Sequence, residues 1–108
     1  MKKYKTIITT TNSKEDSRRI KKNILSKNLS PCIQIITNIE SSYYWNGKIN
    51  SDKEIMILIK ADRRNEQLII NEIESIHSYD IPEIISIDFS ILSDRYEKWF
   101  NKNTKIDK

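Results

Sequence analysis

The sequence predicts a small α+β domain organised around one long β-hairpin. Residues 41–59 contain an aromatic cluster, then Asn46-Gly47, then a charged step and five consecutive apolar residues. Asn-Gly suits a two-residue type I′ turn, because both central residues need positive φ, and Gly47 is the only glycine in the chain. The flanking segments alternate between strand and helix patterns, so we expect a strand-helix-strand-strand-helix-strand order with a short helix at the end.

The N-terminal segment predicts a strand followed by a helix. Residues Tyr4–Thr11 are rich in β-branched side chains, which favour an extended strand. Asn12 is expected to cap a helix over about residues 13–28, with Glu15 at the capping-box position. The apolar stripe of this helix is thin and consists mainly of Ile20, Ile24 and Leu25.

The central segment predicts the two arms of the hairpin. Pro31 separates the first helix from a long second strand, Cys32–Trp45. Polar residues at 38–42 indicate a bend or bulge, so the hairpin tip is expected to project beyond the domain body. The third strand is predicted over residues 53–61.

The C-terminal half predicts one helix, one strand and a short last helix. Asp62 can cap a helix over about residues 63–77, whose isoleucines recur at helical spacing. Residues 83–90 alternate as a fourth strand. Ser93 or Asp94 is expected to cap the last helix, which carries aromatic side chains along one side.

This order of elements is the ferredoxin-like split pattern, in which both long helices cover one face of a four-stranded sheet. The alternative is an open α+β sandwich of another topology. Ile55, Ile57 and Ile59 are assigned to the face that the helices leave bare, and leaving all three in water would forfeit about 4.5–9 kcal/mol. We therefore expect another subunit to cover this face.

Length and charge indicate a single domain, residues 1–108, with a flexible tail from about residue 102. The net charge of +4 raises the question of a nucleic-acid partner, but basic and acidic residues alternate through most of the chain. The dense basic run at residues 18–22 fits a solvated helix face better than a phosphate-binding patch. We expect no nucleic-acid partner.

The single cysteine, Cys32, excludes an intramolecular disulfide and fits a reducing compartment. No apolar stretch of signal-peptide length follows the N-terminal lysines, and no apolar run reaches transmembrane length. The expectation is a cytoplasmic protein with no membrane partner.

Composition also excludes several kinds of site. One glycine cannot build a Walker loop or a dinucleotide fingerprint, since both need several glycines beside phosphate. One histidine and one cysteine cannot form a four-ligand Cys/His zinc site within one chain, although subunits could share one. No nucleophile pairs with His77, so we do not expect an enzyme.

The remaining candidates each have a structural and a functional interpretation. His77 is a helix-terminal residue or a metal ligand. Cys32 is a small buried side chain or a ligand. Glu54 and Lys60 are charged residues at the solvated ends of a strand, or they belong to a site. The aromatic run that includes Trp45 fits an interface or core better than base stacking, because no basic residues interleave with it.

Five groups of residues, in order, resemble the CutA divalent-cation tolerance family from about residue 4 to residue 100. The groups are Pro31-Cys32-Ile33; Ser42-Tyr43-Tyr44-Trp45-Asn46-Gly47-Lys48; Glu54 with Lys60; His77-Ser78-Tyr79-Asp80-Ile81-Pro82-Glu83; and Tyr96 with Trp99. The aromatic-Trp-x-Gly and His-x-Tyr-x-x-Pro-Glu patterns together are specific to that family.

The resemblance implies a homotrimer similar to the PII signalling trimers, in which the sheets face inward and the long hairpin embraces a neighbour. It implies clefts between subunits where seven residues gather: Cys32, Trp45, Glu54, Lys60, His77, Tyr79 and Glu83. The implied ligand is copper or another divalent cation at His77, or a small molecule, and the fold requires neither. The alternative is a PII-like signalling or scaffold trimer that binds a small anionic metabolite through Lys60.

The chain departs from the family pattern at five positions. Ser78 stands where proline is usual, Asp80 where Glu or Gln is common, and Ala61 where threonine is usual. Some relatives offer a cysteine and a second histidine as copper ligands, at the positions that Thr9 and Ile76 occupy here. A copper site of that kind is reduced to His77, with Cys32 or a carboxylate from another subunit.

Overall fold

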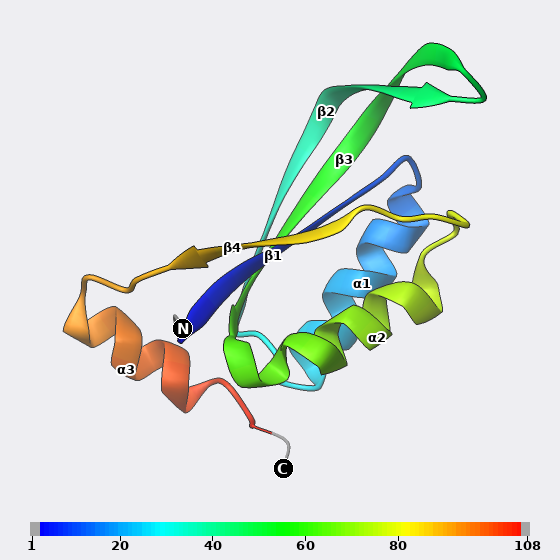
Figure 1. The fold of residues 1–108 in the computed structure, drawn as a ribbon. Coiled ribbons are helices and arrows are strands. Elements are labelled where there is room, and N and C mark those ends of the chain that lie inside the picture. The colour runs from blue at the N-terminus through cyan, green and yellow to red at the C-terminus, as the bar shows by residue number, and fades with distance from the viewer. Residues whose placement is uncertain (1–2, 107–108) are drawn as a thin grey trace.

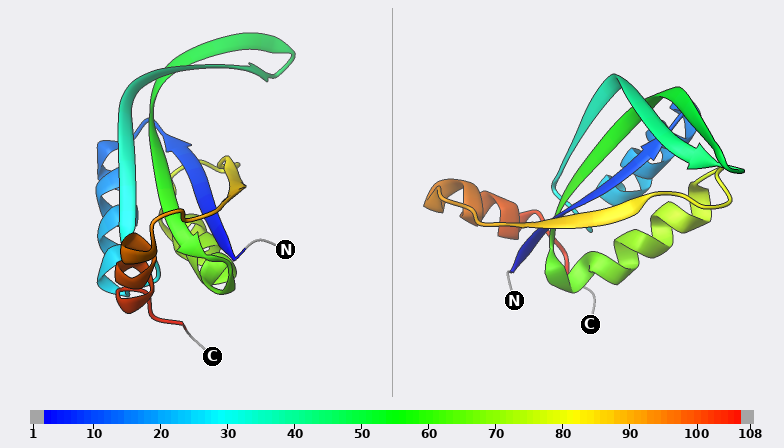
Figure 2. Two further views of the ribbon diagram at one scale, coloured as in Figure 1. Left: turned by 90° about the vertical axis from the view of Figure 1, so that its left-hand side faces the viewer. Right: turned by 45° about the horizontal axis from the view of Figure 1, so that its top comes forward.

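The computed structural model describes residues 3–106 and confirms the predicted ferredoxin-like order (Figure 1). The strands are β1 (Tyr4–Thr11), β2 (Cys32–Trp45), β3 (Lys48–Asp62) and β4 (Ile84–Phe89), and the helices are α1 (Lys14–Ser26), η1 (Arg63–Asn65), α2 (Glu66–Ile76) and α3 (Asp94–Lys102). The sheet order is β2-β3-β1-β4 and each neighbouring pair is antiparallel. Helices α1 and α2 lie side by side on one face of this sheet (Figures 1 and 2). None of the helices within residues 3–106 has the length and apolarity that crossing a bilayer requires.

The helix caps agree with the sequence in two cases and differ in one. Asp62 accepts a hydrogen bond from the amide of Arg64 at 2.9 Å, and Ser93 caps α3, as predicted. The prediction for α1 was wrong, because Ser13 and not Asn12 is its N-cap. The hydroxyl of Thr11 accepts a hydrogen bond from the amide of Ser13 at 3.1 Å, which places the start of the helix one residue later.

The β2–β3 hairpin has the predicted turn and a predicted irregularity. Asn46 and Gly47 have φ of 52° and 74°, as a type I′ turn requires. Strand β3 starts directly after this turn, well before residue 53. The register steps from Ile36↔Met56 to Ile39↔Glu54, so a bulge lies at the base of the hairpin. Beyond it the hairpin bends sharply and projects past the other strands (Figures 1 and 2).

The face of β3 that packs under the helices is the opposite of the one that we predicted. Ile57 and Ile59 are fully buried in the core with residues of α1 and α2, and Ile55 packs against the same core. The register explains this, since Ile59 pairs with Ile7, which is itself a core residue. Strand alternation yields two sets of residues but does not say which set faces the helices.

The face of the sheet opposite α1 and α2 is nevertheless apolar and uncovered. We call it the open face, and its apolar residues include the buried Ile8 and the partly or more fully exposed Ile36, Met56, Leu58, Ile85 and Ile87. Ile36, Ile85 and Ile87 are 49%, 50% and 57% exposed. The sheet thus has an exposed apolar face, as we expected. That face contains the even-numbered residues Met56 and Leu58 of β3, and not Ile55, Ile57 and Ile59.

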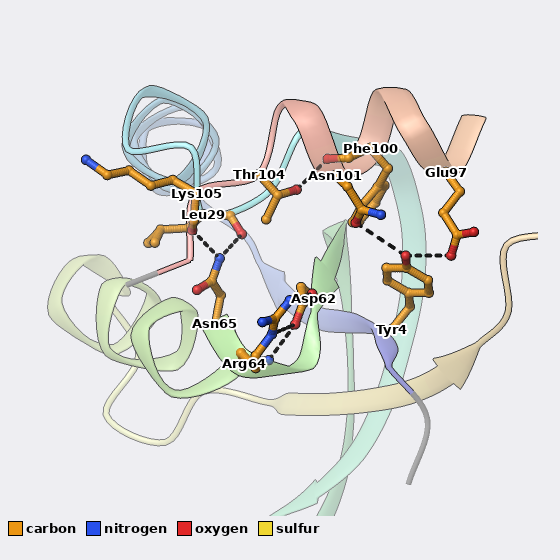
Figure 3. Close-up of polar contacts among 10 residues, drawn as sticks. All are labelled: Tyr4, Leu29, Asp62, Arg64, Asn65, Glu97, Phe100, Asn101, Thr104 and Lys105. Carbon is orange, nitrogen blue, oxygen red and sulfur yellow. Dashed lines mark hydrogen bonds and ion pairs between the residues drawn. The ribbon is translucent and has the colours of Figure 1, made fainter. Parts of the chain in front are cut away.

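The chain beyond α3 is tied to the domain body as far as Lys105 (Figure 3). The amide of Lys105 donates to the carbonyl of Asn28 at 2.8 Å. The side-chain amide of the fully buried Asn65 donates to the carbonyls of Leu29 and Lys105, at 3.1 and 2.8 Å. The segment up to Lys105 is thus hydrogen bonded to the domain body, whereas the flexible tail expected from about residue 102 stays a prediction, and its residues 107–108 lie outside the described residues.

Candidate functional site

The structure distributes five of the seven predicted site residues over the two ends of the sheet. Glu54, His77 and Tyr79 meet near the end of β1. Cys32 and Lys60 are register partners at the other end. Glu54 and Lys60 are six residues apart on β3, which corresponds to roughly 20 Å at the usual rise of a strand. One chain therefore does not bring these residues into a single site.

His77 follows α2 directly and uses both nitrogens of its ring. Its Nδ1 accepts a hydrogen bond from the amide of Tyr79 at 3.1 Å, and its Nε2 lies 2.7 Å from the carbonyl oxygen of Thr10. Because a carbonyl can only accept, Nε2 carries the proton and donates it. The side chain is only 9% exposed and lies against the ring of Tyr79, with 4.6 Å between ring centroids.

The surroundings of His77 do not fit a metal ion bound by one chain alone. A histidine ligates a metal through the lone pair of an unprotonated nitrogen, and here that lone pair accepts the Tyr79 amide. Within the described part of the chain, no group of three or more His, Cys, Asp or Glu side chains could hold a metal ion. A metal at His77 would need to displace one hydrogen bond and to take donors from another subunit.

Tyr79 connects the turn after β1 with strand β3. Its hydroxyl donates to Oε2 of Glu54 at 2.6 Å and accepts a hydrogen bond from the amide of Asn12. Burial, followed by the hydrogen bond and charge of Glu54, raises the pKa of the Tyr79 phenol well above its usual value. The phenol therefore stays protonated at neutral pH and keeps the buried Glu54 carboxylate hydrogen bonded.

Asp16 and Ser78 support this site, and our sequence analysis did not identify their contact. Oδ2 of Asp16 accepts hydrogen bonds from the amide and the hydroxyl of Ser78, at 2.9 and 2.6 Å. Asp16 is only 6% exposed and lies on α1 in the same stripe as Ile20 and Ile24, at intervals of four residues. That spacing was the available signal that a carboxylate faces the interior.

The Cys32–Lys60 end of the sheet borders on helix α3. Tyr96 of α3 shares a hydrogen bond with the side chain of Cys32, and burial, followed by the effect of this thiol, raises the pKa of the Tyr96 phenol. Lys60 and Tyr96, with residues 89–93, line a hollow of about 250 Å³. The structure thus places a cation and a phenol in the lining of one small hollow, and the thiol of Cys32 beside that phenol.

Trp45 and Glu83 belong to neither group. Trp45 ends β2 at the tip of the hairpin and is 53% exposed, and Glu83 is exposed just before β4. That Trp45 and Glu83 lie in a cleft between subunits stays a prediction, since a second copy of the chain is needed to form such a cleft.

Comparisons with known proteins agree with this fold. The family model described as CutA1 divalent ion tolerance protein matches residues 5–103. The crystal structure of divalent ion tolerance protein CutA1 from Ehrlichia chaffeensis is 36% identical, with a TM-score of 0.88 over 98% of this chain and 99% of that chain. The crystal structure of CutA1 from Pyrococcus horikoshii is 29% identical, with a TM-score of 0.86 over 94% of this chain and 98% of that chain.

Curated relatives differ in length. The chloroplastic protein CutA of Arabidopsis thaliana is 29% identical over 99 residues, which are 92% of this chain but 54% of the plant protein. The chain thus spans about half the length of that relative. The divalent-cation tolerance protein CutA of Thermus thermophilus is 26% identical over 91% of this chain and 95% of its own length. With almost its whole length matched by the family model and by a solved CutA1 structure, this chain belongs to the CutA1 divalent ion tolerance family.

Proposed function

We propose that the protein acts in divalent-cation tolerance as a homotrimer that binds its ligand in the clefts between subunits. The observation that carries this proposal is the open face, where Ile36, Ile85 and Ile87 are each about half exposed. Burial of such side chains stabilises an assembly by about 25 cal/mol for each Å² removed from water. The projecting hairpin adds a second surface, with Trp45 and Ile49 exposed near its tip.

Assembly would also complete the site. Within one chain the group around His77 and the group around Cys32 stand at opposite ends of the sheet. A neighbouring subunit can bring its Cys32 or a carboxylate close to His77 and supply the donors that a cation needs. The proposed ligand is a divalent cation, with copper as the first candidate, because imidazole and thiolate both suit copper.

Titration calorimetry with Cu²⁺ tests this proposal on the assembled protein. We expect saturable Cu²⁺ binding that is lost in His77→Ala and retained in the matched control Asn71→Ala, an exposed position on α2. Circular dichroism and light scattering must show that both variants keep the fold and the assembly state. Undiminished Cu²⁺ binding by a folded His77→Ala variant would contradict the assignment to His77.

A second candidate function is binding of a small anionic metabolite, with the metal incidental. The observation that favours it is the hollow beside Lys60 and Tyr96. Calorimetry with citrate in the presence of a chelator would separate the two functions. Metal-independent binding that is lost in Lys60→Ala, but kept in Lys98→Ala on the exposed side of α3, would favour the anion. Equal binding by both variants would count against Lys60.

A further inference from the structure

A groove of about 400 Å³ lies at the base of the hairpin, between the start of α1 and the bulge of β2. It is separate from the hollow beside Lys60. Nine residues line it: Asn12, Lys14, Ser17, Ile35, Thr37, Asn38, Lys53, Glu54 and Ile55. Its volume falls within the range of small-molecule sites, roughly 300–1,000 Å³.

Two unpaired cations from different elements meet at this groove. Lys14 comes from the first turn of α1, and Lys53 comes from β3. Among residues 3–106 neither ammonium group forms an ion pair with an acidic side chain. Their charges are therefore available to a ligand.

The acidic groups near the groove are already occupied. Glu54 is only 7% exposed, and its carboxylate accepts the hydroxyl of Tyr79. Asp16 is held by Ser78, and Glu15 pairs with Arg18 at 2.6 Å. The net charge of the groove lining itself is positive, with two lysines against one carboxylate.

The bulge and the apolar lining complete the groove. The register passes from Ile36 to Ile39, so Thr37 and Asn38 have no register partners on β3, and Asn38 has a φ of 59°. This irregularity opens polar backbone and side chains toward the groove. Ile35 and Ile55 supply apolar contact area beside them.

We propose that the groove binds a small organic anion with a short apolar chain. Its carboxylate lies between Lys14 and Lys53, and its hydrocarbon chain contacts Ile35 and Ile55. The nine lining residues come from one protomer, and the groove shares Glu54 with the proposed inter-subunit cleft but contains neither His77 nor Lys60. An anionic head without an apolar chain, or a chain without charge, satisfies only half of the lining.

Titration of the ¹⁵N-labelled protein with hexanoate, followed by two-dimensional NMR, tests the proposal. We expect saturable shifts at residues that line the groove, including Lys14, Asn38 and Ile55. Hexanol lacks the charge and inorganic phosphate lacks the chain, so each is expected to bind at least about tenfold more weakly. Shifts that scatter over the surface, or equal binding of hexanol, would overturn the proposal.

Paired variants with the same net charge isolate the two lysines. We expect Lys14→Gln/Lys53→Gln to weaken hexanoate binding by about tenfold or more, since it removes two charge-assisted contacts. The control is Lys21→Gln/Lys48→Gln, which removes two exposed lysines outside the groove and should leave binding unchanged. Equal losses in both pairs would show general charge attraction and would overturn the proposal. Cu²⁺ binding at His77 is measured separately, so either idea can fail alone.

Discussion

Asp16 positions the segment that carries His77 through a carboxylate buried in the face of α1. Burial alone would raise its pKa, but the hydrogen bonds from the hydroxyl and the amide of Ser78 and from the hydroxyl of Thr11 outweigh burial, so the pKa lies below its usual value of 3.8. Replacing Asp16 by alanine leaves the amide and the hydroxyl of Ser78 without their acceptor. We expect Asp16→Ala to lower the free energy of unfolding by about 1–3 kcal/mol at pH 7, measured by urea denaturation.

The lowered pKa of Asp16 predicts how the contribution of this carboxylate to stability depends on pH. The pKa of Asp16 is lower in the folded chain than in the unfolded chain. Its ionised carboxylate therefore stabilises the fold at pH values above the unfolded-state pKa, and this stabilisation is lost as the pH falls through the folded-state pKa. The difference between wild type and Asp16→Ala should therefore shrink as the pH falls from about 5 to below 3.8. Glu74→Ala, an exposed position on α2, is the control. A difference that stays constant over this range would contradict the role of the ionised carboxylate.

Tyr79 makes a second prediction at this scale. Tyr79→Phe removes the donor from the buried Glu54 carboxylate but keeps the ring against His77. We expect the free energy of unfolding to fall by about 1–3 kcal/mol, because an acceptor bound at 2.6 Å loses its partner. Tyr44→Phe, at a side chain that is 76% exposed, should change stability by less than about 0.5 kcal/mol. Equal stability of the two variants in urea would refute this role for the Tyr79 hydroxyl.

The sequence identified candidate site residues, but it did not reveal which groups these residues would hydrogen bond. The sequence identified His77, Tyr79 and Glu54 as candidates through motif resemblance, and the structure brings these three together. It did not reveal that both nitrogens of His77 are engaged, because one partner is the carbonyl of Thr10, a backbone group 67 residues away. A backbone acceptor leaves no signature in side-chain identity.

At the scale of elements, local chemistry predicted turns and caps better than faces. The Asn46-Gly47 turn follows from the positive φ that a type I′ turn demands. The face of β3 could not be predicted in the same way, because Ile57 and Leu58 are both apolar and alternation is symmetric. Long-range pairing of β3 with β1 decides it, and that pairing is not encoded in either strand alone.

Helix α3 and the segment after it form an element-scale latch that depends on Asn65. The amide group of Asn65 holds the carbonyls of Leu29 and Lys105, as Figure 3 shows. Asn65→Ala leaves both carbonyls without this donor, so the segment should detach more often. We expect faster hydrogen exchange at the amide of Lys105, which is bonded to Asn28.

The control for the latch is Asn71→Ala, at an exposed asparagine of α2 that accepts only from Gln67. In Asn71→Ala, the rate of hydrogen exchange at the Lys105 amide should match that of the wild type. Unchanged protection of Lys105 in Asn65→Ala would mean that the Lys105–Asn28 bond alone secures the segment. The composition of this lysine-rich end did not reveal these contacts, since they use the backbone groups of Lys105 and not its side chain.

At the scale of the whole molecule, the chain is elongated, with extents of 46 × 25 × 24 Å. The projecting hairpin and helix α3, which lie at opposite ends of the molecule, account for this shape (Figure 1). An isolated two-stranded ribbon is marginally stable in water, so its outer half is expected to need contacts from outside its own chain. The sequence predicted from apolar content that one face of the sheet needs a cover, but it could not identify which isoleucines meet the helices and which stay exposed.

The two sets of isoleucines provide the sharpest test of assembly. Ile87 lies on the open face and is 57% exposed in the single chain, whereas Ile57 is fully buried beneath the helices. Ile87→Lys should leave the fold of a protomer intact while placing a charge in the proposed interface, and Ile57→Lys should bury an unpaired charge and unfold the protein. Light scattering is therefore expected to show a folded monomer for Ile87→Lys and circular dichroism a loss of structure for Ile57→Lys. Ser86→Lys is the control, since Ser86 is exposed on the same strand but pairs with Ile7 on the helix face of the sheet. It should stay assembled, and an Ile87→Lys variant that also stayed trimeric would contradict assembly through the open face.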